Sequence, residues 1–410
     1  MRSIAFALSL VFIFLVPWEG LVRFPLGTLA RTLGLAVGAF WLGTVIIQGR
    51  LRKLTPYHVM VCLFVLWNAA SVMWSANPNK SVAHLRTWTQ TLVLVFIMWD
   101  LYTTRPAILA GLQAYILGAY VAVGSAVQNY FSGNAYYTNY QRFSPGDTNP
   151  DGFGFILALG IPLAWYLAGI KRTGRMAPLW RFVNYAYIPA AFLGLALSGT
   201  RTALVASLVG MAFGLISLTR LRIWARIAIF VVLSAVILIL WPYVQTLESF
   251  QRLGTTGTEL TQGDLNNRTN NWREGLEAFV EHPIIGIGSN MYRSINSLGK
   301  VGHNSFISVL VELGLIGFFL FGTILVIVFN QAWSHSSKWD KSFWLTVFAV
   351  WTIGSSTLTW EHRKTTWLFL SFIIASAMLA KQREAKRNKA IQSPSPLNQT
   401  TVTQTEVLSH

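Results

Sequence analysis

Long apolar runs alternate with short polar segments along most of this chain. Since a transmembrane helix needs about 20 consecutive, mostly apolar residues, the pattern predicts about twelve spans. The predicted spans cover residues 3–21, 28–48, 57–75, 82–102, 106–129, 151–169, 180–199, 201–218, 223–242, 304–330, 341–359 and 364–380. We therefore expect an all-α integral membrane protein in which residues 1–380 form one transmembrane domain.

Polar segments separate and follow these spans. Residues 243–303, between the ninth and tenth spans, form a long loop that is too polar to enter the bilayer. After about residue 381 the chain turns to Ser, Thr, Gln and Pro. A segment of this composition cannot bury enough apolar surface to fold, so 381–410 is expected to be a disordered, basic tail.

Composition excludes a water-soluble protein. Hydrophobic residues make up 53% of the chain and charged residues only 11%, whereas soluble domains carry about 25% charged residues. The single cysteine, Cys62, lies inside an apolar span. A lone cysteine excludes an intramolecular disulfide and a zinc site built from cysteines.

The net charge of +17 comes from 32 Lys and Arg against 15 Asp and Glu. Basic residues gather in short loops between spans, which is typical of cytoplasmic loops and unlike a nucleic-acid-binding surface. The clusters lie at 50–53, 171–175, 220–226 and 381–389. We expect both termini in the cytoplasm, the long loop on the outer face, and membrane lipids but no nucleic acid as partners.

Arginines recur on the predicted outer face. Arg142 precedes the sixth span together with Asn149, Arg201 lies between the seventh and eighth, and Arg268 begins an amphipathic stripe in the long loop. Singly, a capped turn, a snorkelling side chain and a solvated side chain explain them. Because the guanidinium fork matches phosphate oxygens, they are also candidates for an anion-binding site.

His303 and Asn304 open the tenth span at the same face. Ser305, Ser308 and Glu312 follow at helical spacing, which puts Glu312 about 10 Å deeper than Ser305 on one helix face. A lone histidine at such a place is usually structural, and residues 361–364 further on look like an exposed turn with a charge pair. Taken together, these residues predict a cationic outer-face pocket that contains a titratable base.

Four stretches resemble the superfamily of O-antigen ligases and polymerases in bacterial polysaccharide assembly. They are residues 142–154 (RFSPGDTNPDGFG), 198–203 (SGTRTA), 268–288 (RTNNWREGLEAFVEHPIIGIG) and 303–317 (HNSFISVLVELGLIG); residues 361–367 (EHRKTTW) also look similar. The resemblance implies a GT-C-like, metal-independent transmembrane glycosyltransferase without a cofactor. Such enzymes lie in the inner (plasma) membrane, face the periplasm, and use a glycan linked to undecaprenyl diphosphate.

Residue by residue, the resemblance implies that His303 is the catalytic histidine and that Arg201 and Arg268 bind the diphosphate. Arg142 is expected to assist them. His303 would act as general base on the acceptor hydroxyl, in a direct displacement with inversion. Substrate-binding or orienting roles are expected for Asn149, Asn304 and Glu312.

We predict a ligase that passes the glycan to lipid A-core or a similar acceptor. A polymerase that passes it to a growing glycan uses the same donor and is the nearest alternative. From a different class, a transporter or flippase with twelve spans would also explain the apolar pattern. The sequence shows no half-to-half symmetry, which many such carriers have.

Overall fold

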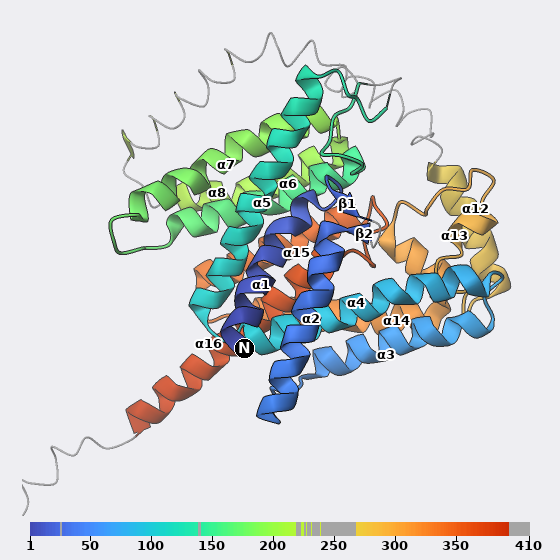
Figure 1. Cartoon of the computed structure of the whole chain (residues 1–410), viewed down its shortest axis with the longest axis horizontal. Coiled ribbons are helices and arrows are strands. Elements are labelled where there is room, and N and C mark those ends of the chain that lie inside the picture. Colours follow the sequence, from blue (N-terminus) through green and yellow to red (C-terminus); the bar gives the residue numbers. More distant parts are fainter. Residues whose placement is uncertain are drawn as a thin grey trace, which may run out of the picture.

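The computed structural model of the chain describes residues 1–24, 27–137, 141–218 and 268–392, and the single residues 223, 224, 227, 231 and 238. In this part of the chain the architecture is almost entirely helical (Figure 1). The elements are α1 (Arg2–Leu15), η1 (Val16–Trp18), β1 (Arg23–Phe24), β2 (Gly27–Thr28), α2 (Leu29–Gln48), α3 (Pro56–Ala70), η2 (Ser71–Met73), α4 (Pro78–Leu101), α5 (Arg105–Phe131), α6 (Pro150–Gly169), α7 (Ala177–Ser198), α8 (Arg201–Leu218), α12 (Arg268–Glu281), α13 (Tyr292–Ile295), α14 (Ser305–Trp333), α15 (Lys338–Ser355) and α16 (Lys364–Gln392).

A helix stands at every predicted span that the described residues cover. Among the described residues, six helical segments are long and apolar enough to cross a membrane: α2, α3 with η2, α5, α6, α14 and α16 up to Lys389. Two shorter apolar helices, Arg2–Trp18 and Arg201–Ile216, accompany them. The prediction of an all-α, multi-pass membrane protein agrees with this architecture. Apart from residues 223, 224, 227, 231 and 238, the span predicted at 223–242 lies outside the described residues, as do residues 243–267 of the long loop.

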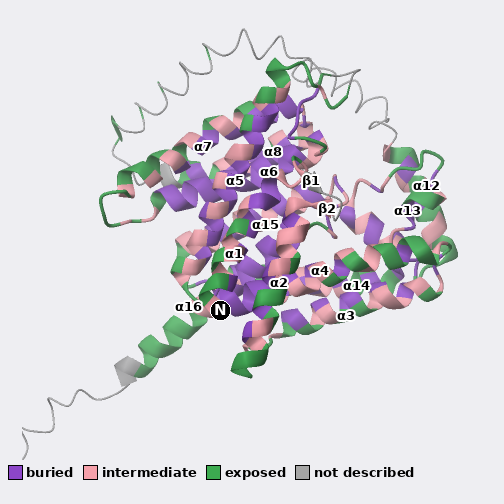
Figure 2. Cartoon of the chain, in the orientation of Figure 1, coloured by how far each residue is buried: buried purple, intermediate pink, exposed green. Residues whose placement is uncertain are grey.

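Helix α6 lies at the centre of the bundle. Asn149 caps its first turn and Pro150 occupies its first position, both typical of a helix start. In its apolar window 89% of the residues are buried, because α5, α7, α8 and α15 pack around it. Figure 2 shows this buried centre in purple. A helix that is apolar on all sides is suited to such a position.

The last helix is longer than the sequence pattern predicted. Residues 381–392 were expected to belong to a disordered tail, but α16 continues through them to Gln392. Lys, Gln, Arg, Glu and Ala dominate this stretch, and all of them favour helix. Residues 393–410 lie outside the described part of the chain.

Helix α14 is broken at Gly314, where φ is 65° and ψ is −168°. The break frees carbonyl groups that an unbroken helix would use. The backbone N–H groups of Ile287 and Gly288 donate to the carbonyls of Val311 (3.1 Å) and Glu312 (2.8 Å). The indole N–H of Trp67 donates to the Leu313 carbonyl at 2.9 Å. The glycine-rich turn before α13 is therefore hydrogen-bonded into the membrane helix.

Glycine is required on both sides of this contact. A Cβ atom on Gly314 would overlap the Ile284 carbonyl, and one on Gly286 would lie 2.5 Å from the Glu312 carbonyl. Both residues also have positive φ values, which residues with a side chain rarely adopt. The end of the long loop is thus fixed to the bundle ahead of the predicted catalytic histidine in the sequence.

Candidate active site

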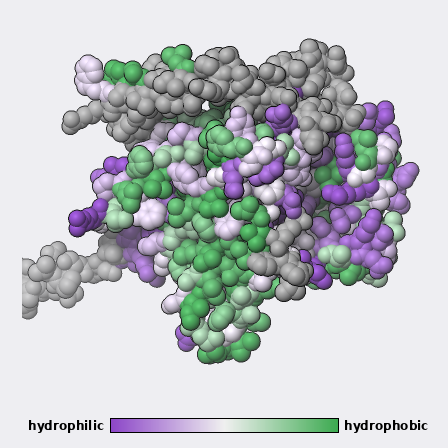
Figure 3. Space-filling view, turned by 45° about the horizontal axis from the view of Figure 1, so that its top comes forward, coloured by the Kyte–Doolittle hydropathy of each residue, from purple (hydrophilic) through white to green (hydrophobic). Residues whose placement is uncertain are grey.

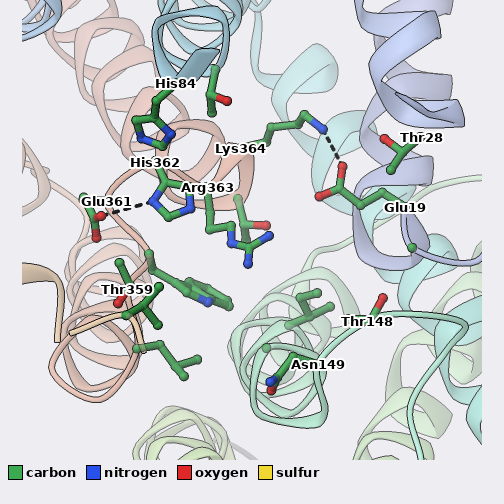
Figure 4. A pocket seen from close by; sticks show the side chains of 18 of the residues that line it. Glu19, Thr28, His84, Thr148, Asn149, Thr359, Glu361, His362, Arg363 and Lys364 are labelled. Atoms are coloured by element: carbon green, nitrogen blue, oxygen red, sulfur yellow. Dashed lines mark hydrogen bonds and ion pairs between the residues drawn. The ribbon is translucent and has the colours of Figure 1, made fainter. Parts of the chain in front are cut away.

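A cavity of about 740 Å³ opens where η1, α4, α6 and the segments around residues 290–303 and 358–365 meet. Three of the predicted site residues line it: Asn149, His303 and Glu312. Figure 4 shows Asn149 and Thr148 on one side of the cavity and Thr359 and residues 361–364 across from them, with Arg363 pointing into the open space. The other ionisable lining residues are Glu19, Arg31, His84, Asp147, Arg293, Glu361, His362, Arg363 and Lys364.

Residues 361–364 form part of the cavity wall, so their interpretation as an exposed turn is wrong. Glu361 is only 6% exposed, and its Oε1 atom lies 3.1 Å from Nδ1 of His362. The His362 ring packs edge-on against His84, with ring centroids 5.2 Å apart. Helix α4 and this turn are far apart in the sequence, and the only local signal of their role was the likeness of residues 361–367 to the superfamily.

Four basic and four acidic side chains line the cavity. More of the basic ones lack a hydrogen-bond or ion-pair partner among the described residues. Glu19 forms an ion pair with Lys364, and Glu361 and Glu312 accept hydrogen bonds from other groups of the protein. Asp147 also has a partner. The side chains of Arg31, Arg293 and Arg363 make no hydrogen bond or ion pair with any residue that the structure describes. Sequence reasoning missed Arg31 and Arg293, and included Arg363 only as part of the turn at 361–364.

His303 is held in an unusual conformation. Its φ of 48° is rare for a residue with a side chain, and such strained residues cluster at active sites. The backbone N–H of His303 donates to Oγ1 of Thr359 at 3.0 Å. From α12, Asn271 and Trp272 donate to the carbonyls of Val301 (2.9 Å) and Gly302 (2.7 Å). The ring atom Nδ1 is buried and has no hydrogen-bond partner among the described residues.

Burial lowers the pKa of His303 to about 4. The positive charge of Arg268 acts in the same direction, and the negative charge of Asp151 opposes it. The imidazole is therefore neutral at pH 7 and able to accept a proton. A bound anion would offset the positive charges around the ring and raise its pKa toward neutrality.

Arg142 is paired within the protein. It is 6% exposed, lies 2.5 Å from Asp151, and donates from Nε to the Ser198 carbonyl at 2.6 Å and from a terminal nitrogen to Thr200 Oγ1 at 3.0 Å. These contacts join the start of α6 to the junction of α7 and α8. The structure therefore gives Arg142 a bracing position behind the cavity. The sequence analysis missed its partner Asp151.

The other two predicted arginines begin helices: Arg201 is the first residue of α8 and Arg268 the first of α12. Burial lowers the pKa of Arg268, while the negative charge of Asp151 raises it. Arg268 also acts on the His303 ring, so the structure brings Arg268, Asp151 and His303 together. Neither Arg201 nor Arg268 is among the residues that line the cavity.

Both predicted asparagines cap helices. The side-chain oxygen of Asn304 accepts from the backbone N–H groups of Phe306 (2.9 Å) and Ile307 (3.1 Å), and Asn304 does not line the cavity. The corresponding oxygen of Asn149 accepts from Asp151 N–H at 2.8 Å. Only Asn149 is thus in a position to reach a bound substrate, through its amide nitrogen.

Glu312 is tied to the backbone of the loop before α13. Its carboxylate accepts from the N–H groups of Asn290 (2.8 Å) and Tyr292 (3.0 Å). Asn290 has a φ of 63°, so this contact stabilises a strained turn. The arrangement gives Glu312 an orienting position, and a contact with sugar hydroxyls stays a prediction. Within the described residues, no group of three or more His, Cys, Asp or Glu could hold a metal ion.

Two comparisons with known proteins bear on this site. Residues 186–322, which contain Arg201, Arg268, His303 and Glu312, match the family model described as O-antigen ligase. The exopolysaccharide production protein ExoQ of Rhizobium meliloti (strain 1021) is 26% identical over 322 residues, covering 72% of this chain and 70% of ExoQ. Both support the resemblance seen in the sequence to the superfamily of O-antigen ligases and polymerases.

Proposed function

We propose that this protein transfers a glycan from undecaprenyl diphosphate to an acceptor hydroxyl at the periplasmic face of the inner membrane. The observation that carries the proposal is the cavity itself. It combines a neutral, partly buried histidine with three arginines whose side chains have no ion-pair partner in the described part of the chain. Such a site suits a substrate that is both anionic and rich in hydroxyl groups.

The chemistry is a single displacement at the anomeric carbon. The acceptor oxygen attacks this carbon, the bond to the diphosphate oxygen breaks, and the electron pair leaves with the diphosphate, so the configuration inverts. His303 takes the acceptor's proton. Arginines stabilise the negative charge that develops on the leaving group. In this proposal Arg31, Arg293 and Arg363 supply the positive charge inside the cavity. Arg201 and Arg268, which do not line it, keep the diphosphate-binding role implied by the resemblance as a prediction, and Arg142 braces the start of α6. Neither a metal nor a cofactor takes part.

The two candidate acceptors differ in what supports them. The matched family model is described as O-antigen ligase, which favours lipid A-core. The relative covering most of the chain is named for exopolysaccharide production, which favours a growing glycan as acceptor and hence a polymerase. Both reactions use the same donor and the same cavity.

A transfer assay in proteoliposomes tests the proposal. Wild type and His303→Ala receive undecaprenyl-diphosphate glycan with or without lipid A-core, and His282→Ala serves as control because His282 is exposed at the end of α12. We expect wild type and His282→Ala to transfer glycan and His303→Ala to be inactive while still inserting into the membrane. Glycan on the core identifies a ligase, and longer lipid-linked chains identify a polymerase.

Two outcomes would contradict the proposal. Transfer by His303→Ala at the wild-type rate would remove the histidine from the mechanism. Movement of the donor across the bilayer without transfer to either acceptor would identify a flippase instead.

A further inference from the structure

A second cavity, of about 340 Å³, lies between α1, α2 and α4. Its lining is almost entirely apolar, with Phe12 on α1, Leu35 and Leu42 on α2, and Val93 and Ile97 on α4. Only a few polar side chains line it. Three of these, Arg31, Gln90 and Lys364, also line the candidate active site, so the two cavities adjoin there.

Small residues on α2 create the space. Gly34 and Gly38 both line the cavity. A Cβ atom on Gly34 would lie 3.1 Å from the Phe12 ring, and one on Gly38 would lie 3.4 Å from a methyl group of Val93. Side chains larger than a methyl group at these positions would fill the cavity.

The cavity is reachable from the lipid side of the bundle. Helix α2 lies at the periphery, since only 22% of its apolar window is buried. Two residues that line the cavity, Leu35 and Leu42, are more than half exposed. Hydrophobic side chains also cover a broad area of the surface in Figure 3. The space is therefore an apolar groove that begins beside the active site and opens toward the membrane.

We propose that this groove binds the polyprenyl chain of the lipid-diphosphate donor, starting at the isoprene units next to the diphosphate. This inference rests on the proposed function. Arg31 stands at the junction of the two cavities without an ion-pair partner in the described chain, where the diphosphate of such a donor would lie. One molecule with an anionic head, a glycan on one side and an apolar chain on the other fills both cavities.

The bilayer is itself apolar, so the chain gains no hydrophobic free energy by entering the groove, and only closer packing favours it. The groove therefore selects the donor by the shape of its chain and aligns the diphosphate with the active site. Filling the groove should lower kcat/KM for a long-chain donor without changing the residues that carry out the transfer.

The test compares two donors that carry the same glycan, one on undecaprenyl and one on dimethylallyl, a single isoprene unit. Gly38 lies seven residues, or about 10 Å, along α2 from Arg31, so a single isoprene unit at the diphosphate ends before it. Gly38→Phe fills the groove, and Gly124→Phe is its matched control because a Cβ atom at Gly124 in α5 meets open space. We expect Gly38→Phe to lower kcat/KM for the undecaprenyl donor about tenfold, with the dimethylallyl donor used as by wild type. Gly124→Phe should leave both values unchanged.

Val93→Phe fills the groove from the opposite wall and repeats the test if Gly38→Phe does not fold. Arg31→Gln should raise KM for both donors by the same factor, because it removes a contact with the shared head group. Equal use of both donors by wild type, or an equal loss for both in the groove variants, would overturn the inference. Absence of transfer by wild type from either donor would instead overturn the proposed function.

Discussion

Replacing Arg142 distinguishes two possible roles of this side chain, binding of the diphosphate and bracing of the helices around it. Arg142→Met removes the ion pair with Asp151 and the hydrogen bonds to Ser198 and Thr200. The side chains of Arg142 and Asp151 are only 8% and 20% exposed. Breaking a buried pair from one side costs about 3–5 kcal/mol, because it leaves the other charge uncompensated.

Replacing both partners should cost less than the two single changes together. Arg142→Met/Asp151→Asn leaves no unpaired charge at this place, so we expect the double variant to regain about 1–3 kcal/mol relative to the sum. Membrane proteins often unfold irreversibly, so the half-life at a fixed temperature in detergent is the quantity to compare across the cycle. Transfer activity is measured on the same preparations.

We expect a large loss of stability for Arg142→Met and recovery in the double variant. The bracing role is refuted if Arg142→Met has the half-life of wild type but loses transfer activity through a raised KM for the donor. In that case Arg142 contacts the diphosphate and assists the other arginines, as expected from the sequence.

Further predictions concern the histidine, the helix break and the buried glutamate. The low pKa of His303 predicts that kcat/KM stays level as pH falls from 8 to about 5 and then decreases, because only the neutral ring accepts a proton; a fall already near pH 6.5 would contradict it. Arg268→Gln removes a charge that lowers this pKa, so the acid limb of the pH profile should move to higher pH. The pKa of His303 is lower in the folded than in the unfolded state. His303 therefore stabilises the fold above about pH 6.5 and loses that contribution as pH falls toward 4. Thermal unfolding at several pH values measures this loss. Gly314→Ala should destabilise by about 3 kcal/mol or more through strain and overlap, whereas Gly322→Ala, which meets open space in the same helix, should not; equal unfolding temperatures would refute this. Glu312→Gln keeps the shape of the side chain but weakens its hydrogen bonds to Asn290 and Tyr292, so the rate of glycan transfer should fall. Adding His303→Ala to this variant should lower the transfer rate by a larger factor.

The helices could be predicted from the sequence because their signal is local. A run of about 20 apolar residues needs no knowledge of its neighbours, and helices stand at those runs throughout the described chain. The extension of α16 was missed because a polar, helix-favouring stretch resembles a disordered one in composition. In water-exposed segments the two differ in helix propensity more than in polarity.

The cavity was only partly predictable because its walls come from distant segments. His303 and Glu312 were found, since His303 lies just before the helix that carries Glu312 at a regular spacing. Arg31 was missed because it lies near the end of a span, where an arginine needs no special explanation. The ion pair between Glu19 and Lys364, 345 residues apart in the sequence, illustrates contacts that no local pattern encodes.

The contact between the two glycines at the break in α14 sets a rule for recombining this chain with its relatives. Ile287 and Gly288 donate hydrogen bonds to the carbonyls of Val311 and Glu312. Leu315 and Ile316 of the helix donate in return to the carbonyls of Pro283 and Ile284. A chimera joined anywhere between Pro283 and Ile316 would combine a turn from one parent with a broken helix from another. Segment 283–316, which carries His303, is therefore a single unit of exchange, and crossover points for acceptor-swapping libraries belong outside it.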